Sequence, residues 1–228
     1  MNAELNFRLC LNIKGLRYRT IWVEFPDIEA LCKKIGAKPT SSVAPFYTLP
    51  VIHDPSTDIV ISNSIDIARY LDETYPSTTQ LFPPNSNALL ESFQIPNIRA
   101  CLIPIVAPLI CAHLSPVSQE YYRRTKELSF GNKLEDLSPP GPLRIQHWQQ
   151  LKHCFGVVDG WLAKNGQRKQ FVMGDLMSYA DVTIVGCVMF MKLILGAESQ
   201  EWKEIESWHD GRWSTFLADF AEYLVVVV

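Results

Sequence analysis

The first 76 residues alternate between apolar and polar positions in a way that predicts a mixed helix and strand region. Apolar residues at helical spacing predict helices, and short runs of β-branched and aromatic residues predict strands. The predicted elements are, in order, a helix at 3–16 that stops near Gly15, a strand at 18–25, a helix at 27–35, a hairpin within 46–61, and a helix that ends at Tyr75-Pro76.

The hairpin is the strongest local prediction in this region. Pro55 lies in a polar cluster between two β-branched runs, which is typical of a turn between strands. Leu49-Pro50 stands where the first strand begins, a position that tolerates proline. Only about 5% of X-Pro bonds are cis, so a trans bond is the default expectation. A cis bond would turn the backbone N–H and C=O of Leu49 outward toward a ligand.

The helix after the hairpin has a favourable start. Ser62, Asn63 and Ser64 are all good capping residues. A helix N-terminus presents free N–H groups and a partial positive charge, so it attracts a carboxylate. The strand edge can pair with a peptide backbone, and the helix start beside it can hold a carboxylate. Together they indicate a binding site for a small peptide. On spacing alone, an ordinary capped helix after a hairpin is the favoured alternative.

The chain changes character after residue 76. Residues 77–87 are polar and rich in proline, which predicts a domain boundary. Beyond them only helical patterns follow, with a break or kink expected at Pro96, Pro104 and Pro108. Ser178 and Asp181 form a capping box, in which Ser178 accepts from the Asp181 N–H and the carboxylate answers the Ser178 N–H. The helix at 182–195 is apolar nearly all round, so we expect it to be the buried centre of the second domain.

Leu49-Pro50 followed by residues 63–76 resembles the glutathione-binding half of the glutathione transferase N-terminal domain, which has a thioredoxin-like fold. The resemblance implies that Leu49, before a cis Pro50, pairs with the cysteinyl backbone of reduced glutathione. It also implies that Asn63 and Ser64 hold the γ-glutamyl end. Asn63 departs from the usual Glu or Asp, since an amide hydrogen-bonds the amine but supplies no charge. Lys38 precedes a loop that passes near the glycine carboxylate in this family, although a solvated loop lysine is slightly favoured.

The beginning of the sequence departs from that family. The family domain begins with a strand in the middle of its sheet, whereas this sequence opens directly in a helix, so we expect the sheet to lack its first, central strand. The family's catalytic Tyr, Ser or Cys would fall near Met1 and Asn2, where no hydroxyl or thiol stands. Asn2 or Asn6 could hydrogen-bond a thiolate, but solvent-facing helix residues are the favoured interpretation. A truncated or mis-spliced gene model is one hypothesis for this start and for the valine tail at 225–228.

Further segments resemble the fungal-specific glutathione transferases related to bacterial β-aryl-etherases; they are 12–16, 22–28, 122–127 with 130–131, and 208–213. This resemblance implies transfer of glutathione to a hydrophobic or aromatic electrophile, in detoxification or secondary-metabolite chemistry, by a homodimer. Trp208 and Trp213 would line the hydrophobic substrate pocket; a packed turn between the last helices is the equal alternative. A catalytically inactive protein that binds glutathione or hydrophobic ligands, and a partner-binding remnant of the fold, also stay open.

Composition narrows the classes of protein and of functional site that the sequence allows. The 228 residues are 47% apolar and 20% charged with a net charge of −3, which is typical of a globular protein and argues against a nucleic-acid surface. The six cysteines and five histidines show no metal-ligand spacing, so we expect no metal and reduced thiols in a cytoplasmic protein. Nothing resembles a signal peptide, and the longest apolar run, 101–112, is too short to span a bilayer.

These observations predict an α/β domain followed by an all-α domain. The expected organisation is a thioredoxin-like, N-terminally truncated glutathione-binding domain at 1–76, a linker at 77–87, and an all-helical glutathione transferase C-terminal domain at 88–228.

Overall fold

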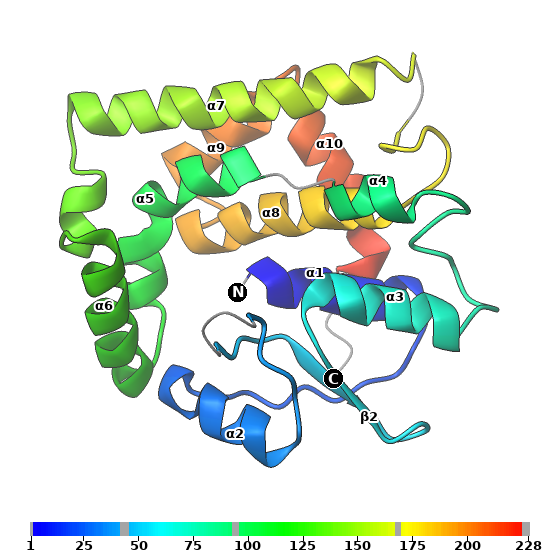
Figure 1. Cartoon of the computed structure of the whole chain (residues 1–228). Coiled ribbons are helices and arrows are strands. Elements are labelled where there is room, and N and C mark those ends of the chain that lie inside the picture. Colours follow the sequence, from blue (N-terminus) through cyan, green and yellow to red (C-terminus); the bar gives the residue numbers. More distant parts are fainter. Residues whose placement is uncertain (1, 42–45, 93–95, 167–169, 225–228) are drawn as a thin grey trace. The chain divides into compact units, whose positions relative to one another are not determined.

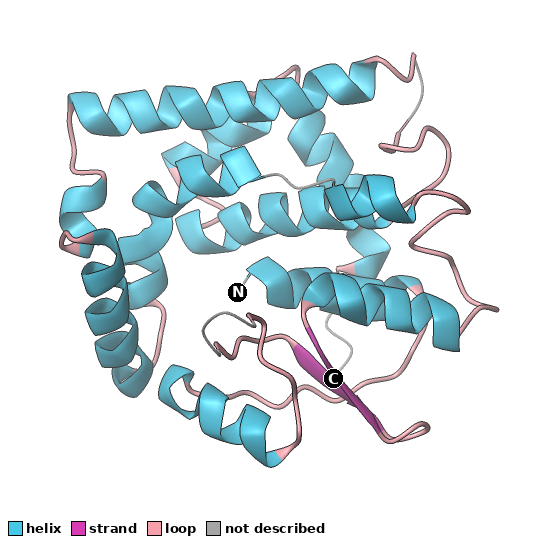
Figure 2. Ribbon diagram, in the orientation of Figure 1, coloured by secondary structure: helices cyan, strands magenta, loops and turns pink. Residues whose placement is uncertain are grey.

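The computed structural model describes residues 2–41, 46–92, 96–166 and 170–224 (Figure 1). Helices dominate the fold, as Figure 2 shows. The chain forms two compact units. The first comprises Met1–Gln94, Leu176–Cys187 and Phe220–Val228, and the second comprises Ile95–Asp175 and Val188–Asp219.

The first unit contains most of the predicted mixed region. Its antiparallel hairpin pairs Val51 with Ser62 at one end and Asp54 with Ile59 at the other. The predicted hairpin and all three predicted helices are present, with ends that differ by a few residues. The elements are α1 (Asn2–Ile13), the 3-10 helix η1 (Phe25–Asp27), α2 (Ile28–Lys34), β1 (Val51–Asp54), β2 (Ile59–Ser62), α3 (Ser64–Thr74), α4 (Asn87–Ser92) and the 3-10 helix η3 (Ala221–Tyr223).

The Asp54 carboxylate fastens the hairpin turn to α3. It accepts hydrogen bonds from the backbone N–H of Ser56 at 2.9 Å, the hydroxyl of Tyr70 at 2.7 Å and the hydroxyl of Tyr75 at 2.5 Å. Burial by itself would raise the pKa of Asp54, but the hydrogen bonds from Tyr75, Ser56 and Tyr70 outweigh it and lower the pKa below its ordinary value. The turn therefore rests on an ionised carboxylate.

The strand predicted at 18–25 is wrong. Residues 17–24 are neither helix nor strand, and the backbone groups of 17–23 make no hydrogen bond with any residue that the structure describes. Ile21 and Trp22 are 67% and 72% exposed. A strand forms only beside another strand that accepts its hydrogen bonds. Within the described ranges the sheet has two strands, β1 and β2, so this strand-forming sequence lies without a neighbour.

Apolar faces join α1 to α3, which lie side by side in Figure 1. Leu9 and Cys10 of α1 are buried, as are Ile67, Ala68 and Leu71 of α3. Ile67 and Ala68 lie four and three residues before Leu71, which places them on one stripe of α3, and this stripe packs with α1 in the apolar centre of the first unit.

The second unit is helical. Its α5 continues through Pro104 and Pro108, so neither proline breaks the helix, and a kink at these prolines stays a prediction. Helix α8 begins in the first unit and ends in the second. The elements are α5 (Pro96–Ala112), α6 (Pro116–Phe130), the 3-10 helix η2 (Leu134–Leu137), α7 (Pro142–Ala163), the end of α8 (Tyr179–Leu195), α9 (Gln200–Ser207) and α10 (Arg212–Asp219).

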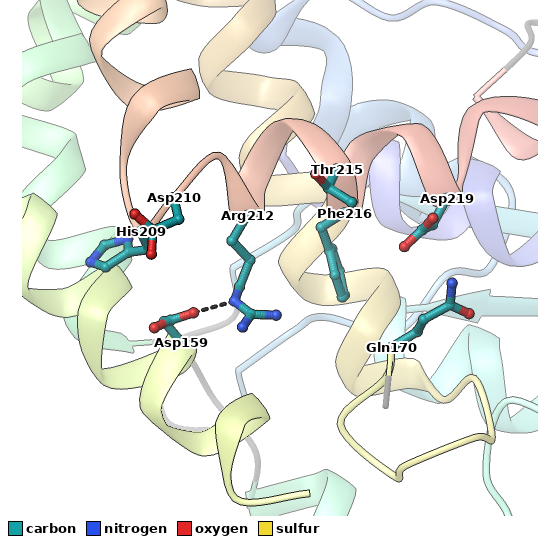
Figure 3. A pocket seen from close by; sticks show the side chains of 8 residues that line it. All are labelled: Asp159, Gln170, His209, Asp210, Arg212, Thr215, Phe216 and Asp219. Carbon is teal, nitrogen blue, oxygen red and sulfur yellow. Dashed lines mark hydrogen bonds and ion pairs between the residues drawn. The ribbon is translucent and has the colours of Figure 1, made fainter. Parts of the chain in front are cut away.

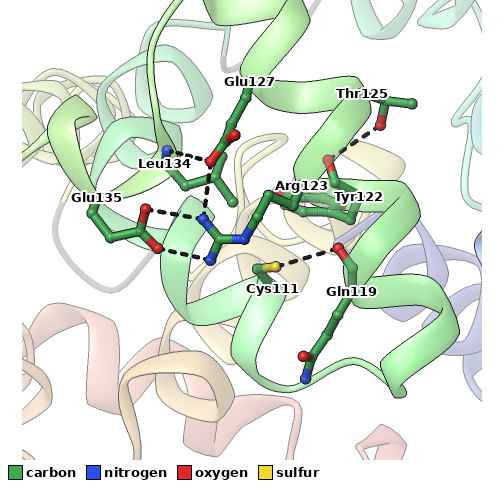
Figure 4. Close-up of polar contacts among 8 residues, drawn as sticks. All are labelled: Cys111, Gln119, Tyr122, Arg123, Thr125, Glu127, Leu134 and Glu135. Carbon is green, nitrogen blue, oxygen red and sulfur yellow. Dashed lines mark hydrogen bonds and ion pairs between the residues drawn. The ribbon is translucent and has the colours of Figure 1, made fainter.

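Arg123 joins α6 to η2 (Figure 4). Its guanidinium donates to Glu127 at 2.9 Å and to the two carboxylate oxygens of Glu135 at 3.0 and 2.8 Å. The hydrogen bonds from Arg123 lower the pKa of Glu135. Glu127 also accepts from the backbone N–H of Leu134 at 3.3 Å. The hydrogen bonds from Arg123 to Glu135 and from Leu134 to Glu127 therefore hold η2 against α6.

Most of helix α8 is buried as predicted, but its first part, through Cys187, belongs to the first unit and not to the second. Its start carries the predicted capping box. The backbone N–H of Ser178 donates to the Asp181 carboxylate at 2.8 Å. The Ser178 hydroxyl donates to the same oxygen at 2.8 Å, a different role from the predicted acceptor. Both residues are fully buried. Among the described helices, none combines the length and the hydrophobicity needed to cross a bilayer.

Candidate functional site

The hairpin register brings four of the predicted ligand-binding residues to one end of the sheet. Val51 pairs with Ser62, so Leu49 and Pro50 precede the paired end of β1 just as Asn63 and Ser64 follow the paired end of β2. The peptide bond between Leu49 and Pro50 is cis, although trans was the default expectation.

Lys38 reaches the same end of the sheet. The hydroxyl of Ser62 donates to the carbonyl oxygen of Lys38 at 2.8 Å, which holds the Lys38 backbone beside the end of β2. The Lys38 side chain is exposed and makes no ion pair within the described part of the chain. The five predicted binding residues are therefore neighbours, and the ammonium of Lys38 is available to pair with an anionic ligand.

Leu49 presents an unused pair of backbone groups. Its N–H and C=O make no hydrogen bond with any of the residues that the structure describes. Pro50 is buried and Leu49 is exposed, so this donor and acceptor stand at the surface of the unit. An unpaired N–H and C=O on one residue is what an extended peptide needs to pair with a sheet edge.

The start of α3 lies beside this backbone pair. Asn63 is the N-cap, with φ +74°, and its side-chain oxygen accepts from the N–H of Ile65 at 3.4 Å. Ser64 is the first helical residue. Its N–H donates to no described residue, so it remains available at the positive end of the helix. A carboxylate placed here would receive hydrogen bonds and a favourable helix field.

A further residue touches Ser64, and the helical pattern gave no sign of it. The hydroxyl of Tyr179, at the start of α8, donates to the hydroxyl of Ser64 at 3.1 Å. The Tyr179 ring is 6% exposed and stacks on Phe82 with ring centroids 5.4 Å apart. Burial raises the pKa of Tyr179 well above its ordinary value, so the phenol is protonated at neutral pH. In the sequence, Tyr179 was marked only by its place inside the capping box formed by Ser178 and Asp181.

The region expected to activate a thiol is only partly visible. Met1 lies outside the described residues, and so does the side chain of Asn2, although Asn2 begins α1. Asn6 is 7% exposed, so its expected solvent-facing position is wrong, and its side-chain oxygen has no hydrogen-bond partner among the described residues. Cys10 is fully buried, and burial raises the pKa of its thiol, which is therefore neutral.

Trp208 and Trp213 are packed inside the second unit. They are 1% and 0% exposed. Both contact Phe155, with ring centroids 6.0 and 4.8 Å away, respectively. The structure thus places both indoles in the helix packing around the turn between α9 and α10, and the cavity described next is lined by neither. A role for them in holding a hydrophobic substrate stays a prediction.

A cavity of about 570 Å³ lies in the second unit beside this turn (Figure 3). Arg212 pairs with Asp159 across it. His209 accepts a hydrogen bond from the Trp213 indole N–H at 2.9 Å, and burial lowers the pKa of this imidazole. The cavity shares no residue with the site at Leu49 and Ser64.

All six cysteines are free thiols. Among the described residues no group of three His, Cys, Asp or Glu side chains could hold a metal ion. The predicted absence of a metal site stays a prediction for the whole chain.

Comparisons with known proteins agree with this geometry. Residues 6–74 match the family described as Glutathione S-transferase, N-terminal domain, and residues 87–223 match Glutathione S-transferase, C-terminal domain. The chain is 27% identical over 222 residues to the Glutathione S-transferase-like protein ustS of Aspergillus flavus, covering 91% of this chain and 78% of that protein.

Two proteins of solved structure have a higher sequence identity to this chain than ustS has. The glutathione S-transferase CsGST63524 of Ceriporiopsis subvermispora, solved in complex with glutathione, is 49% identical, with a TM-score of 0.94 over 98% of this chain and 91% of that chain. Glutathione transferase GSTFuA3 from Phanerochaete chrysosporium is 39% identical, with a TM-score of 0.92 over 98% and 90%.

These matches confirm the predicted fold class, a thioredoxin-like region of helices and a two-stranded sheet together with a helical glutathione transferase C-terminal region. The chain belongs to the glutathione S-transferase family.

Proposed function

We propose that this protein binds reduced glutathione at Leu49 and Ser64 and transfers it to a hydrophobic or aromatic electrophile. The observation that carries the proposal is the unpaired N–H and C=O of Leu49 next to the unpaired N–H of Ser64, whose hydroxyl keeps its own proton for a ligand. The similar protein CsGST63524 was solved in complex with glutathione, which supports the same ligand here.

Glutathione fits these groups by its chemistry. It is a short peptide with a carboxylate at each end. Its cysteinyl N–H and C=O match the free acceptor and donor of Leu49. Its γ-glutamyl carboxylate suits the start of α3 at Ser64, where backbone and hydroxyl donors meet a helix field. Asn63 offers an amide to the amine of that end, and the cation of Lys38 suits the glycine carboxylate.

The transfer requires the thiolate form of glutathione, because the neutral thiol is a weak nucleophile. In the proposed step the thiolate sulfur attacks an electrophilic carbon, and either a leaving group departs or a proton is added. The sequence predicts the thiol-activating position near Met1 and Asn2. Detoxification or secondary-metabolite chemistry is the proposed setting.

A calorimetric titration with reduced glutathione tests binding. We expect saturable binding by the wild-type chain and at least about tenfold weaker binding by Ser64→Ala, because a hydrogen bond to a charged group contributes about 1.5–3 kcal/mol. Ser77→Ala is the matched control, since Ser77 is exposed and follows the far end of α3. No binding by a folded wild-type chain would contradict the proposal.

A catalytically inactive binding protein is the second candidate. It is favoured by α1 itself: the sequence of this helix contains no hydroxyl side chain, and its single thiol, Cys10, is fully buried. Turnover assays with 1-chloro-2,4-dinitrobenzene and phenethyl isothiocyanate discriminate the two. Conjugation supports the transferase, whereas displacement of a fluorescent hydrophobic probe without conjugation supports the binding protein.

Assembly and location are proposed on family grounds. We propose a homodimer, which light scattering after size-exclusion chromatography would test, and a cytoplasmic location, which fractionation would test.

A further inference from the structure

We propose that Tyr179 is a positioning residue of the glutathione site, which directs the hydroxyl proton of Ser64 toward the ligand's γ-glutamyl carboxylate. The inference rests on the proposed function. It assigns a role in ligand recognition to a residue 115 positions away from Ser64, in a segment whose sequence indicated only helix capping.

The contact is a buried hydrogen bond between two hydroxyls. Tyr179 donates to Ser64 at 3.1 Å, and the phenol is almost fully enclosed. A phenol is a stronger acid than an aliphatic alcohol, so the tyrosine is the better donor of the two. Both residues belong to the first compact unit.

The contact with Tyr179 determines where the hydroxyl proton of Ser64 points. A serine hydroxyl has one proton and two acceptor lone pairs. When Tyr179 donates to the Ser64 oxygen, the serine's own proton points elsewhere, and no described residue accepts it. A carboxylate can only accept, so it requires this proton. Fixing the hydroxyl before the ligand arrives removes part of the cost of ordering it, and a chain of hydrogen bonds also polarises the serine O–H.

The position of Tyr179 is set from several sides. Its backbone N–H donates to the carbonyl of Leu81 at 2.8 Å, and its ring stacks on Phe82. The preceding residue, Ser178, is held by the Asp181 carboxylate through two hydrogen bonds. The phenol is therefore held rigidly, as a positioning group should be.

Tyr179→Phe tests the inference because it removes only the hydroxyl and keeps the stacked ring. We expect affinity for reduced glutathione to fall about three- to tenfold, the range of one neutral hydrogen bond. For γ-aminobutyryl-cysteinyl-glycine, which lacks the γ-glutamyl α-carboxylate, we expect no change in affinity. Tyr121→Phe, on α6 in the second unit, is the matched control and should bind both peptides like the wild type.

A double-variant cycle separates positioning from general structure. In a Ser64→Ala background, Tyr179→Phe should cause no further loss of affinity, since its effect passes through the serine hydroxyl. Equal losses for the two peptides, or a full second loss in the Ser64→Ala background, would overturn the inference. A wild-type chain that binds glutathione while Tyr179→Phe keeps full affinity overturns this inference alone. A wild-type chain that does not bind glutathione overturns the proposed function as well.

Discussion

The ammonium of Lys14 lies 2.8 Å from the carboxylate of Asp72, and the Lys14 side chain is completely buried. Lys14 follows the end of α1, and Asp72 belongs to α3. The same ammonium donates to the carbonyl of Thr79 at 3.0 Å, and the carboxylate accepts from the backbone N–H groups of Leu81 and Phe82 at 2.8 Å each. This ion pair connects the end of α1 and helix α3 to the polar, proline-rich segment at 77–87.

Lys14→Met is expected to destabilise the fold strongly. The substitution keeps the aliphatic stem but leaves the Asp72 carboxylate without its cation, and breaking a buried pair from one side typically costs about 3–5 kcal/mol. Urea unfolding measures the change in free energy. Lys33→Met is the control, because Lys33 and Glu29 form an exposed pair four residues apart on α2, and the loss of an exposed pair changes stability little. Similar losses in the two variants would contradict the assigned importance of burial.

Asp54→Asn should remove a pH-dependent part of the stability. The folded pKa of Asp54 lies below its unfolded value of about 3.9, so ionised Asp54 stabilises the fold above that pH. This contribution is lost as the pH falls from about 4 through the lowered folded pKa. At pH 7 we expect Asp54→Asn to cost about 1–3 kcal/mol.

Unfolding free energies from pH 7 down to pH 3 check the sign of this effect. The gap between wild type and Asp54→Asn should narrow toward the acidic end. Asp58→Asn, in the exposed part of the same turn, should stay within about 0.5 kcal/mol of the wild type at pH 7. A gap that stays constant with pH would show that the lowered pKa of Asp54 contributes nothing.

Two glycines of α7 should respond in opposite ways to alanine. A Cβ at Gly160 meets no atom within 4 Å, so Gly160→Ala should stabilise the protein by about 0.5–1 kcal/mol through better helix propensity. A Cβ at Gly156 would lie 3.0 Å from Nε2 of His209, whose ring is held by the Trp213 indole. Overpacking of this kind costs about 1–3 kcal/mol, so Gly156→Ala should destabilise the protein.

Thermal unfolding of both glycine variants gives the comparison. In a His209→Asn background the shorter side chain leaves room, and Gly156→Ala should then lose its penalty. If Gly156→Ala raises the melting temperature as much as Gly160→Ala in the wild-type background, the close approach of His209 is unimportant.

Local signals predicted the features that depend on neighbouring residues in the sequence. The hairpin around Pro55, the start of α3 at Asn63 and the capping box at Ser178 all follow from short-range turn and cap chemistry. The register of the hairpin then brought Leu49 and Ser64 together, as the family resemblance implied. Whether these residues hold glutathione remains a prediction.

The predictions that were wrong or missing depend on contacts between residues that are distant in the sequence. Residues 18–25 have the composition of a strand, but composition does not supply a neighbouring strand. Asn6 carries a polar side chain that would ordinarily face water, yet packing in the first unit covers it. The contact between Tyr179 and Ser64 joins positions 115 residues apart, so neither hydrophobic spacing nor a local motif could indicate it.

The segment at 17–23, which is neither helix nor strand, has a consequence for the protein in concentrated solution. Its backbone groups make no sheet hydrogen bonds within the described residues, and Ile21 and Trp22 are exposed. Unpaired, apolar, strand-forming backbone is a template for another extended chain, which is how edge strands lead to aggregation. The two arginines of the segment, Arg17 and Arg19, oppose this by charge repulsion between molecules. Solubility should therefore fall as salt screens these arginines, with aggregates growing from this segment while the helices stay folded.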